Sequence, residues 1–174
     1  MQEYTRDYVG YGGTPPEFEW PGKSRLALNI VINYEEGSEL GAVEGDQRRE
    51  MMSEVSYPAK PNERELATES LFEYGSRVGV WRIMRILDKH EATCTIYACA
   101  YALSRNPVVT QAFIQRGYDM VGHGYRWLQH YGMTEEQERE QIRKASDLIE
   151  KSTGQRIIGW FTRPMQTPAT RRIL

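Results

Sequence analysis

Two adjacent carboxylates, Glu35 and Glu36, follow the apolar run LALNIVI in the stretch NYEEG (33–37). Adjacent like charges repel, and a plain turn from a strand into a loop does not require them. A carboxylate held against a substrate can act as the general base that activates water, which is the chemistry of hydrolysis. Both residues could equally be solvated acids of a loop. Their position at the end of the most apolar segment instead favours a catalytic site.

An imidazole, a guanidinium and two indoles occur at the ends of later apolar segments. His123 stands between two glycines, which leave its ring uncrowded, and Trp127 follows it. Trp160 and Arg163 lie at and just beyond the end of the segment RIIGWF. A histidine can shuttle protons, and an arginine can hold a carboxylate or a developing oxyanion. The plainer alternatives are a hydrogen-bonded turn for His123 and a surface position for Arg163.

Strand and helix signals alternate along the chain. Residues 25–34 are apolar on both faces, which predicts a strand covered on both sides. Further strands are predicted over 92–100, 119–124 and 156–161. Helices are predicted over 77–90, 106–117 and 133–154, with another helix start in 167–174. The stretch FEYGSRVG (72–79) predicts a tight turn before the first helix, although its polar side chains are equally suited to line a site.

Cap residues support two of these helices. Asn106, followed by proline, is expected to cap the second helix. Thr134 with Gln137 forms the pattern of a capping box at the start of the third helix, and Gly154 is expected to end it.

Alternation of this kind specifies an α/β fold with parallel strands inside and helices outside. The carboxyl ends of parallel strands meet at one edge of the sheet, where ligands bind. We therefore expect the carboxylates, the imidazole, the guanidinium and the indoles to line one cavity. The charged segment 37–76 shows no regular pattern, and so long a loop is usually functional or part of an interface.

Composition excludes several classes of function. The chain has 174 residues, which is enough for one domain with a core. Its net charge of −2 provides no basic surface for binding nucleic acid or an anionic membrane. The sequence has no apolar run long enough to predict a membrane span, and its start does not have the pattern of a secretory signal. Cys94 and Cys99 are predicted to be buried thiols, which favours a cytoplasmic location.

Three motifs resemble those of the polysaccharide deacetylase (NodB-homology) family. NYEEG is similar to the family's Thr-Phe-Asp-Asp-Gly motif, HGYRW (123–127) to its His-Ser-x-x-x-His motif, and FTRP (161–164) to its Arg-Pro motif. The segments ESLFEYGSRVGVWRIMRIL and TGQRIIGWFT resemble the branch that contains cofactor-independent allantoinases and chitin-deacetylase-like proteins. The resemblance covers nearly the whole chain.

The resemblance implies a distorted (β/α) barrel that hydrolyses a C–N amide bond. Residues 1–174 would be a single, partial barrel domain, with 1–24 as an N-terminal arm. The visible pattern supplies fewer strands than a complete barrel contains, so the chain is expected to be its N-terminal half. An open half-barrel exposes a strand edge, which predicts a homo-oligomer or association with the missing half.

The resemblance also assigns roles to residues. Glu35 takes the position of the base, Glu36 that of a metal ligand and His123 that of the first ligand histidine. Trp127 stands at the position of the second histidine, and an indole does not ligate a hard cation. Because a zinc site needs at least three good protein ligands, no metal and no other cofactor are expected, unless a bent loop brings in His130.

A small cyclic imide is the substrate that suits this set of groups, because its carbonyl is electrophilic without a Lewis acid. The expected reaction is the opening of the hydantoin ring of allantoin. Tyr34, Trp127 and Trp160 are predicted to contact the substrate, and Arg163 to hold Glu35 ionised or to bind the substrate. The alternatives are a metal-dependent N-deacetylase of chitin or another amino-sugar polymer, and a non-catalytic module of the same fold.

Overall fold

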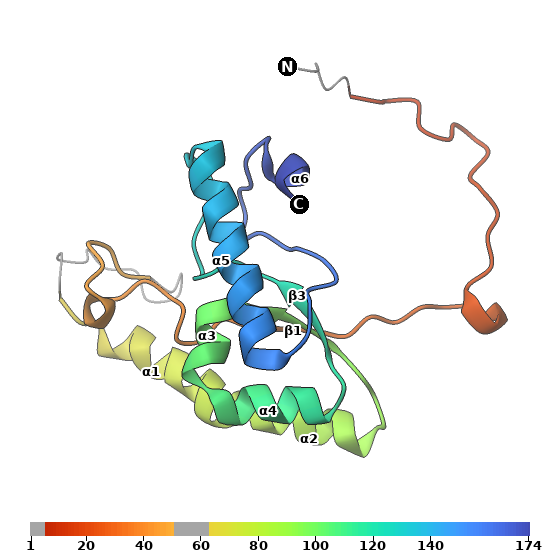
Figure 1. Cartoon of the computed structure of the whole chain (residues 1–174). Coiled ribbons are helices and arrows are strands. Elements are labelled where there is room, and N and C mark those ends of the chain that lie inside the picture. The colour runs from red at the N-terminus through yellow and green to blue at the C-terminus, as the bar shows by residue number, and fades with distance from the viewer. Residues whose placement is uncertain (1–5, 51–62) are drawn as a thin grey trace.

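Three short strands form the centre of the molecule, which is described by a computed structural model over residues 6–50 and 63–174 (Figure 1). The strands β1 (Val31–Tyr34), β2 (Thr95–Ala98) and β3 (Asp119–Gly122) are parallel and lie in the order β1-β2-β3. The predicted α/β class with parallel strands is therefore confirmed.

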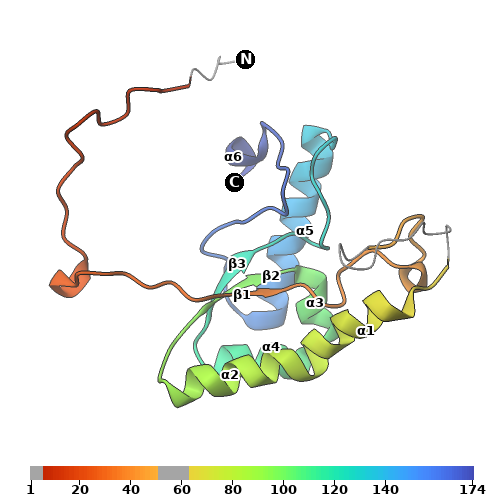
Figure 2. The ribbon, with the colours of Figure 1, turned by 180° about the vertical axis from the view of Figure 1, so that it is seen from behind.

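Strand β1 is shorter than the predicted strand over 25–34. Leu26 and Leu28 continue its apolar alternation, but both side chains are exposed. The neighbouring strand β2 begins at Thr95, opposite Val31. The described residues before Val31 therefore receive from β2 only two bonds of Thr95: its N–H donates to the Ile30 carbonyl, and its hydroxyl donates to Asn29 Oδ1. Residues 6–28 project away from the body as an arm in both views (Figures 1 and 2).

Helices cover one face of the sheet in the described part of the chain. Ile32 and Tyr34 are buried on that face, whereas Val31 and Asn33 point the other way and are exposed. Strand β2 alternates in the same manner. We call the uncovered side, which carries Val31, Asn33 and Tyr97, the open face. The prediction that this strand is covered on both sides is thus wrong, because the described helices pack on one side only.

The predicted fourth strand over 156–161 is reduced to a single parallel bridge between Gly122 and Trp160. The N–H of Gly122 donates to the Gly159 carbonyl at 3.0 Å, and the N–H of Phe161 donates to the Gly122 carbonyl at 2.9 Å. A third bond, from the Ile158 N–H to the Met120 carbonyl at 3.0 Å, also joins this segment to β3.

The helices are α1 (Leu66–Tyr74), α2 (Val80–Lys89), α3 (Ala100–Arg105), α4 (Pro107–Gln115), α5 (Glu135–Thr153) and α6 (Thr170–Ile173), with 3-10 turns at Pro21–Lys23 and Ala42–Glu44. The predicted caps are confirmed. Asn106 accepts a bond from the Val109 N–H, and Thr134 and Gln137 form the reciprocal capping box. Gly154 adopts the left-handed conformation after α5.

The first predicted helix begins eleven residues earlier than expected, at Leu66 instead of residue 77. A π-turn, Gly75–Gly79, joins α1 to α2, so the expected tight turn is instead part of a long helical rod (Figure 2). Sequence pattern misses α1 because Thr68 is its one buried residue, so no apolar stripe marks it. The Glu65 side chain caps it by accepting from the N–H groups of Ala67 and Thr68.

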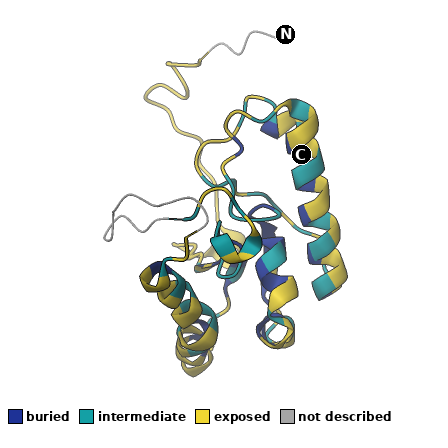
Figure 3. Ribbon diagram, turned by 90° about the vertical axis from the view of Figure 1, so that its left-hand side faces the viewer, coloured by how far each residue is buried: buried dark blue, intermediate teal, exposed yellow. Residues whose placement is uncertain are grey.

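The core lies between the sheet and the helices. The buried residues of α4 and α5 contribute to it, and buried residues are dark blue in Figure 3. Its largest fully buried side chains include Tyr34, Phe113, Met84, Ile96 and Met120. Cys94 and Cys99 are both free and buried, as predicted. Among the described residues, no helix is long and apolar enough to cross a membrane.

Gly122 marks the tightest contact between β3 and the segment after α5. A Cβ at this position would lie 2.5 Å from Trp160 Cζ3 and 3.2 Å from Ile157 Cδ1. We expect Gly122→Ala to reduce the free energy of unfolding by about 1–3 kcal/mol, because the indole would have to move. Gly159→Ala is the matched control, since its Cβ would meet Val121 at an ordinary 3.7 Å. Urea denaturation measures both; equal losses would contradict the packing described.

Candidate active site

Glu35 and His123 meet on the open face, just beyond the carboxyl ends of β1 and β3. Glu35 Oε1 lies 2.8 Å from His123 Nε2, and the Asn33 amide donates to the same oxygen at 3.2 Å. His123 is 2% exposed, and Glu35 is half-buried. Both protein bonds use Oε1, so Oε2 is the oxygen that can receive a water molecule.

The His123 ring is held by its other nitrogen and by two aromatic rings. Nδ1 is hydrogen-bonded to the Phe161 carbonyl oxygen, and the Phe161 ring stacks on the imidazole with centroids 5.2 Å apart. Tyr97 lies against both rings, with its centroid 5.1 Å from that of Phe161. A carbonyl oxygen only accepts, so Nδ1 carries hydrogen. The contact with Glu35 then requires a second proton, either on Nε2 or on the carboxyl group.

Glu36 points to the opposite side of the chain. The Glu35 N–H donates to Glu36 Oε2 at 3.2 Å, and the Glu36 side chain lies against Gly75 at the start of the π-turn. Burial raises the pKa of Glu36, and the neighbouring charges of Glu35 and Glu39 act in the same direction. The two adjacent acids thus take different partners, which limits the repulsion between them.

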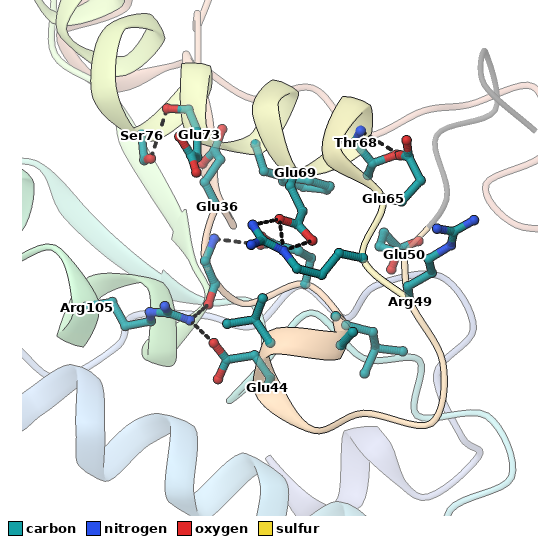
Figure 4. A pocket seen from close by; sticks show the side chains of 18 of the residues that line it. Glu36, Glu44, Arg49, Glu50, Glu65, Thr68, Glu69, Glu73, Ser76 and Arg105 are labelled. Atoms are coloured by element: carbon teal, nitrogen blue, oxygen red, sulfur yellow. Dashed lines mark hydrogen bonds and ion pairs between the residues drawn. The ribbon is translucent and has the colours of Figure 1, made fainter. Parts of the chain in front are cut away.

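Glu36 lines a cavity of about 330 Å³ next to the helical rod. The walls come from the loop after β1, from residues 63–65, from α1 and Ser76, and from the end of α3 (Figure 4). Among the described residues, eight glutamates line it: Glu36, Glu39, Glu44, Glu50, Glu63, Glu65, Glu69 and Glu73. Three arginines, Arg49, Arg64 and Arg105, oppose them. The excess of carboxylates suits a ligand that is rich in N–H donors.

Arg163 does not contact Glu35, contrary to the predicted role of holding it ionised. Its guanidinium forms two bonds of 2.8 Å with Glu50 and donates to the Trp127 carbonyl at 2.9 Å. It also lies over the Trp127 ring, 3.7 Å from the centroid. Trp127 packs in turn on Phe72, which lines the cavity. Arg163 and Trp127 therefore support the cavity wall from behind.

Tyr34 and Trp160 lie on the helix side of the sheet, away from Glu35 and His123. Tyr34 is 1% exposed; its hydroxyl accepts from the Asn106 amide, and its ring packs edge-on against Phe113. Trp160 covers Gly122 and donates from Nε1 to Thr162 Oγ1 at 2.8 Å. The predicted substrate contact of Tyr34 is corrected, because alternation along β1 turns this side chain into the core. Trp160 is partly buried and packs against the core on the same side of the sheet.

The single mouth predicted from sequence is therefore two neighbouring regions. One is the Glu35–His123 pair on the open face, and the other is the cavity lined by Glu36. Sequence reasoning missed Asn33, Tyr97 and Phe161. The signal for Tyr97 is the alternation of side chains along β2. It places Tyr97 beside Val121 of β3, on the same face as His123 two residues later.

The donor groups of the described residues do not fit a metal ion. Glu36 and His123 make no contact with each other, and Trp127 replaces the second histidine with an indole. His130 is buried elsewhere, bonded to Glu138 at 3.0 Å. In residues 6–50 and 63–174 no group of three or more His, Cys, Asp or Glu side chains converges in the manner that a metal site requires. No step through a metal is derived from this arrangement.

Comparison with known proteins places these residues in a family. A model of the family "Polysaccharide deacetylase" matches residues 61–171. A putative polysaccharide deacetylase of Schizosaccharomyces pombe is 38% identical over 153 residues, which cover 86% of this chain and 48% of that protein.

Two solved structures are similar over 98% of this chain and 57% of their own. A probable polysaccharide deacetylase from Pseudomonas aeruginosa is 41% identical with a TM-score of 0.88, and a Puue allantoinase is 42% identical with a TM-score of 0.87. The chain spans about half the length of the relatives it matches.

The raised pKa of Glu36 predicts how stability depends on pH. The folded protein binds this proton more tightly than the unfolded chain does, so the associated stability is complete below the ordinary value of 4.5 and is lost as the pH rises through the folded pKa. Glu36→Gln cannot ionise. We therefore expect the variant to gain stability relative to the wild type between pH 4 and pH 8, as measured by urea unfolding.

The control for this measurement is Ser76→Ala, which changes a side chain of the same cavity that has no ionisable group. Its difference from the wild type should not grow over the same pH interval. A Glu36→Gln difference that is independent of pH would contradict the burial of an ionisable Glu36.

Proposed function

The chain belongs to the polysaccharide deacetylase family, and from this we propose that the protein is a hydrolase of a non-peptide C–N bond that opens the hydantoin ring of allantoin to give allantoate. The observation that carries this proposal is the similarity of nearly the whole chain to a solved allantoinase. The reaction belongs to the degradation of urate and other purines, for which a cytoplasmic location and a small-molecule substrate are proposed.

Glu35 is the proposed general base. Its carboxylate is anchored by His123 and Asn33 through Oε1, and Oε2 takes the water molecule. Removal of a proton from this water creates the nucleophile, which forms a C–O bond to a ring carbonyl carbon. A positioned base of this type contributes roughly 10²–10⁴-fold to the rate.

His123 is the proposed partner in proton transfer. It already shares a proton with Glu35, and its Nδ1 bond to Phe161 fixes the direction of Nε2. As the ring C–N bond breaks, the leaving nitrogen must gain a proton, which the Glu35–His123 pair supplies after taking one from the water. The products are a carboxylic acid and a free ureido group, so atoms and protons balance.

The cavity next to Glu36 is the proposed place for the part of the substrate that does not react. Allantoin carries several N–H groups, and a wall with a surplus of carboxylates offers them acceptors. The imide-like carbonyl of a hydantoin is more electrophilic than an acetamide, so hydrogen bonds suffice to stabilise the developing oxyanion.

A second candidate is an N-deacetylase of chitin or a related amino-sugar polymer. The naming of the fungal relative as a putative polysaccharide deacetylase favours it. Family members of this kind use a divalent metal, and the donor set of the described residues does not fit one.

Glu35→Gln tests the proposed base. We expect turnover of allantoin by the purified protein to fall by roughly 10²–10⁴-fold, because glutamine cannot accept the proton from water. The fold should be unchanged, since the glutamine amide can still bond to His123, and circular dichroism checks this. Glu140→Gln, at an exposed acid of α5 away from the cavity, should keep the wild-type rate. A near-normal rate for Glu35→Gln would remove Glu35 from the mechanism.

Metal dependence separates the two candidates. Hydrolysis of allantoin should be unaffected by a chelator, and elemental analysis of the active protein should find no stoichiometric zinc. Deacetylation of N-acetylglucosamine oligomers that needs added zinc and stops with the chelator would instead establish the second candidate.

A further inference from the structure

Gly75 lies where the π-turn begins and faces the side chain of Glu36. We propose that Gly75 is a positioning residue: its missing side chain opens the space in which the Glu36 carboxylate is held at the cavity wall. The inference rests on the proposed function in one respect, namely that Glu36 acts at the substrate cavity. The structural coupling between the two residues does not depend on it.

Space is the property that this glycine provides. A Cβ built on Gly75 would lie 2.7 Å from Glu36 Cδ and 2.8 Å from Glu36 Cγ, and closer still to Oε1. Atoms of a real side chain do not approach so closely, so any larger residue at position 75 must displace the carboxylate. Figure 4 shows Glu36 beside the helix that carries Glu73 and Ser76.

Backbone conformation does not explain the glycine. Gly75 has φ −55° and ψ −52°, which are ordinary right-handed helical values that every residue adopts. Glycine in a helix interior is less favourable than alanine by about 0.5–1 kcal/mol, so this position lowers the stability of the rod. The compensating gain is the close approach of Glu36.

The π-turn itself directs Gly75 toward Glu36. The N–H of Val80 donates to the Gly75 carbonyl, a bond that spans five residues. Residues five apart in an α-helix point about 140° away from each other, whereas a turn closed by an i→i+5 bond brings them onto the same side of the helix. Val80 is buried against the core, so Gly75 faces the sheet side of the rod. Turns of this kind are frequent at functional sites.

Gly79 is a natural control within the same π-turn. It has φ −58° and ψ −51°, and a Cβ there would meet Tyr74 at 3.5–3.6 Å, which is ordinary contact. Alanine at residue 79 therefore changes helix propensity alone, while alanine at residue 75 also collides with Glu36.

The experiment compares thermal unfolding of the purified protein with Gly75→Ala, Gly79→Ala, Glu36→Ala and the double variant Gly75→Ala/Glu36→Ala. We expect Gly75→Ala to lower Tm by roughly 4–8 °C and Gly79→Ala to leave it unchanged or raise it. In the Glu36→Ala background, Gly75→Ala should no longer lower Tm, because the collision is gone. If Gly75→Ala alone does not fold, folding of the double variant supports the coupling.

A ¹³C NMR titration measures the pKa of the Glu36 carboxyl group. A substitution at Gly75 that affected only the stability of the helix would leave this pKa unchanged. The signal of Glu36 is assigned by its loss in Glu36→Gln. In Gly75→Ala, the carboxylate should leave its buried position, and its pKa should return toward the ordinary value of glutamate. Gly79→Ala should keep the raised pKa of the wild type.

Any one of the following results would overturn the inference: equal Tm changes for Gly75→Ala and Gly79→Ala, the same loss from Gly75→Ala with and without Glu36, or an unchanged Glu36 titration in Gly75→Ala. Failure of the double variant to fold while Glu36→Ala folds would do so as well. Because none of these measurements uses turnover, they remain decisive even if the protein does not hydrolyse allantoin.

Discussion

The bond between Glu35 Oε1 and His123 Nε2 joins the ends of β1 and β3 on the open face, and the rest of the site follows from it. Consecutive carboxylates repel each other, so Glu35 can turn to the imidazole only if Glu36 turns elsewhere. The structure meets this constraint by giving each acid a separate environment. One acid has a hydrogen-bonded histidine, and the other has a slot against a glycine of the helical rod.

This division also separates two chemical tasks. In the proposed function, the Glu35–His123 pair exchanges a proton with water and with the leaving nitrogen. In the same proposal, the cavity lined by Glu36 and other carboxylates accepts the N–H groups of the substrate. Arg163 contributes to neither task directly. Its bonds to Glu50 and its contact with the Trp127 ring support the wall of the cavity.

Sequence pattern predicted the parallel α/β arrangement, the caps of α4 and α5 and the presence of Glu35 and His123 near one edge of the sheet. These features depend on local signals, such as Asn106 before a proline or the spacing of Thr134 and Gln137. Helix α1 escaped prediction because it buries almost nothing. The misassigned role of Tyr34 has a different cause: alternation places it on the same face as Ile32, but which face the helices cover depends on the packing of the whole fold.

The central claim is that His123 carries hydrogen on Nδ1 and shares a further proton with Glu35. Nitrogen-15 NMR of the imidazole, with the His123 signal assigned by substitution, measures the protonation of each ring nitrogen directly. The account predicts a protonated Nδ1 at neutral pH, with Nε2 either protonated or accepting from the Glu35 carboxyl group. A neutral ring with hydrogen on Nε2 and a free lone pair on Nδ1 would contradict it.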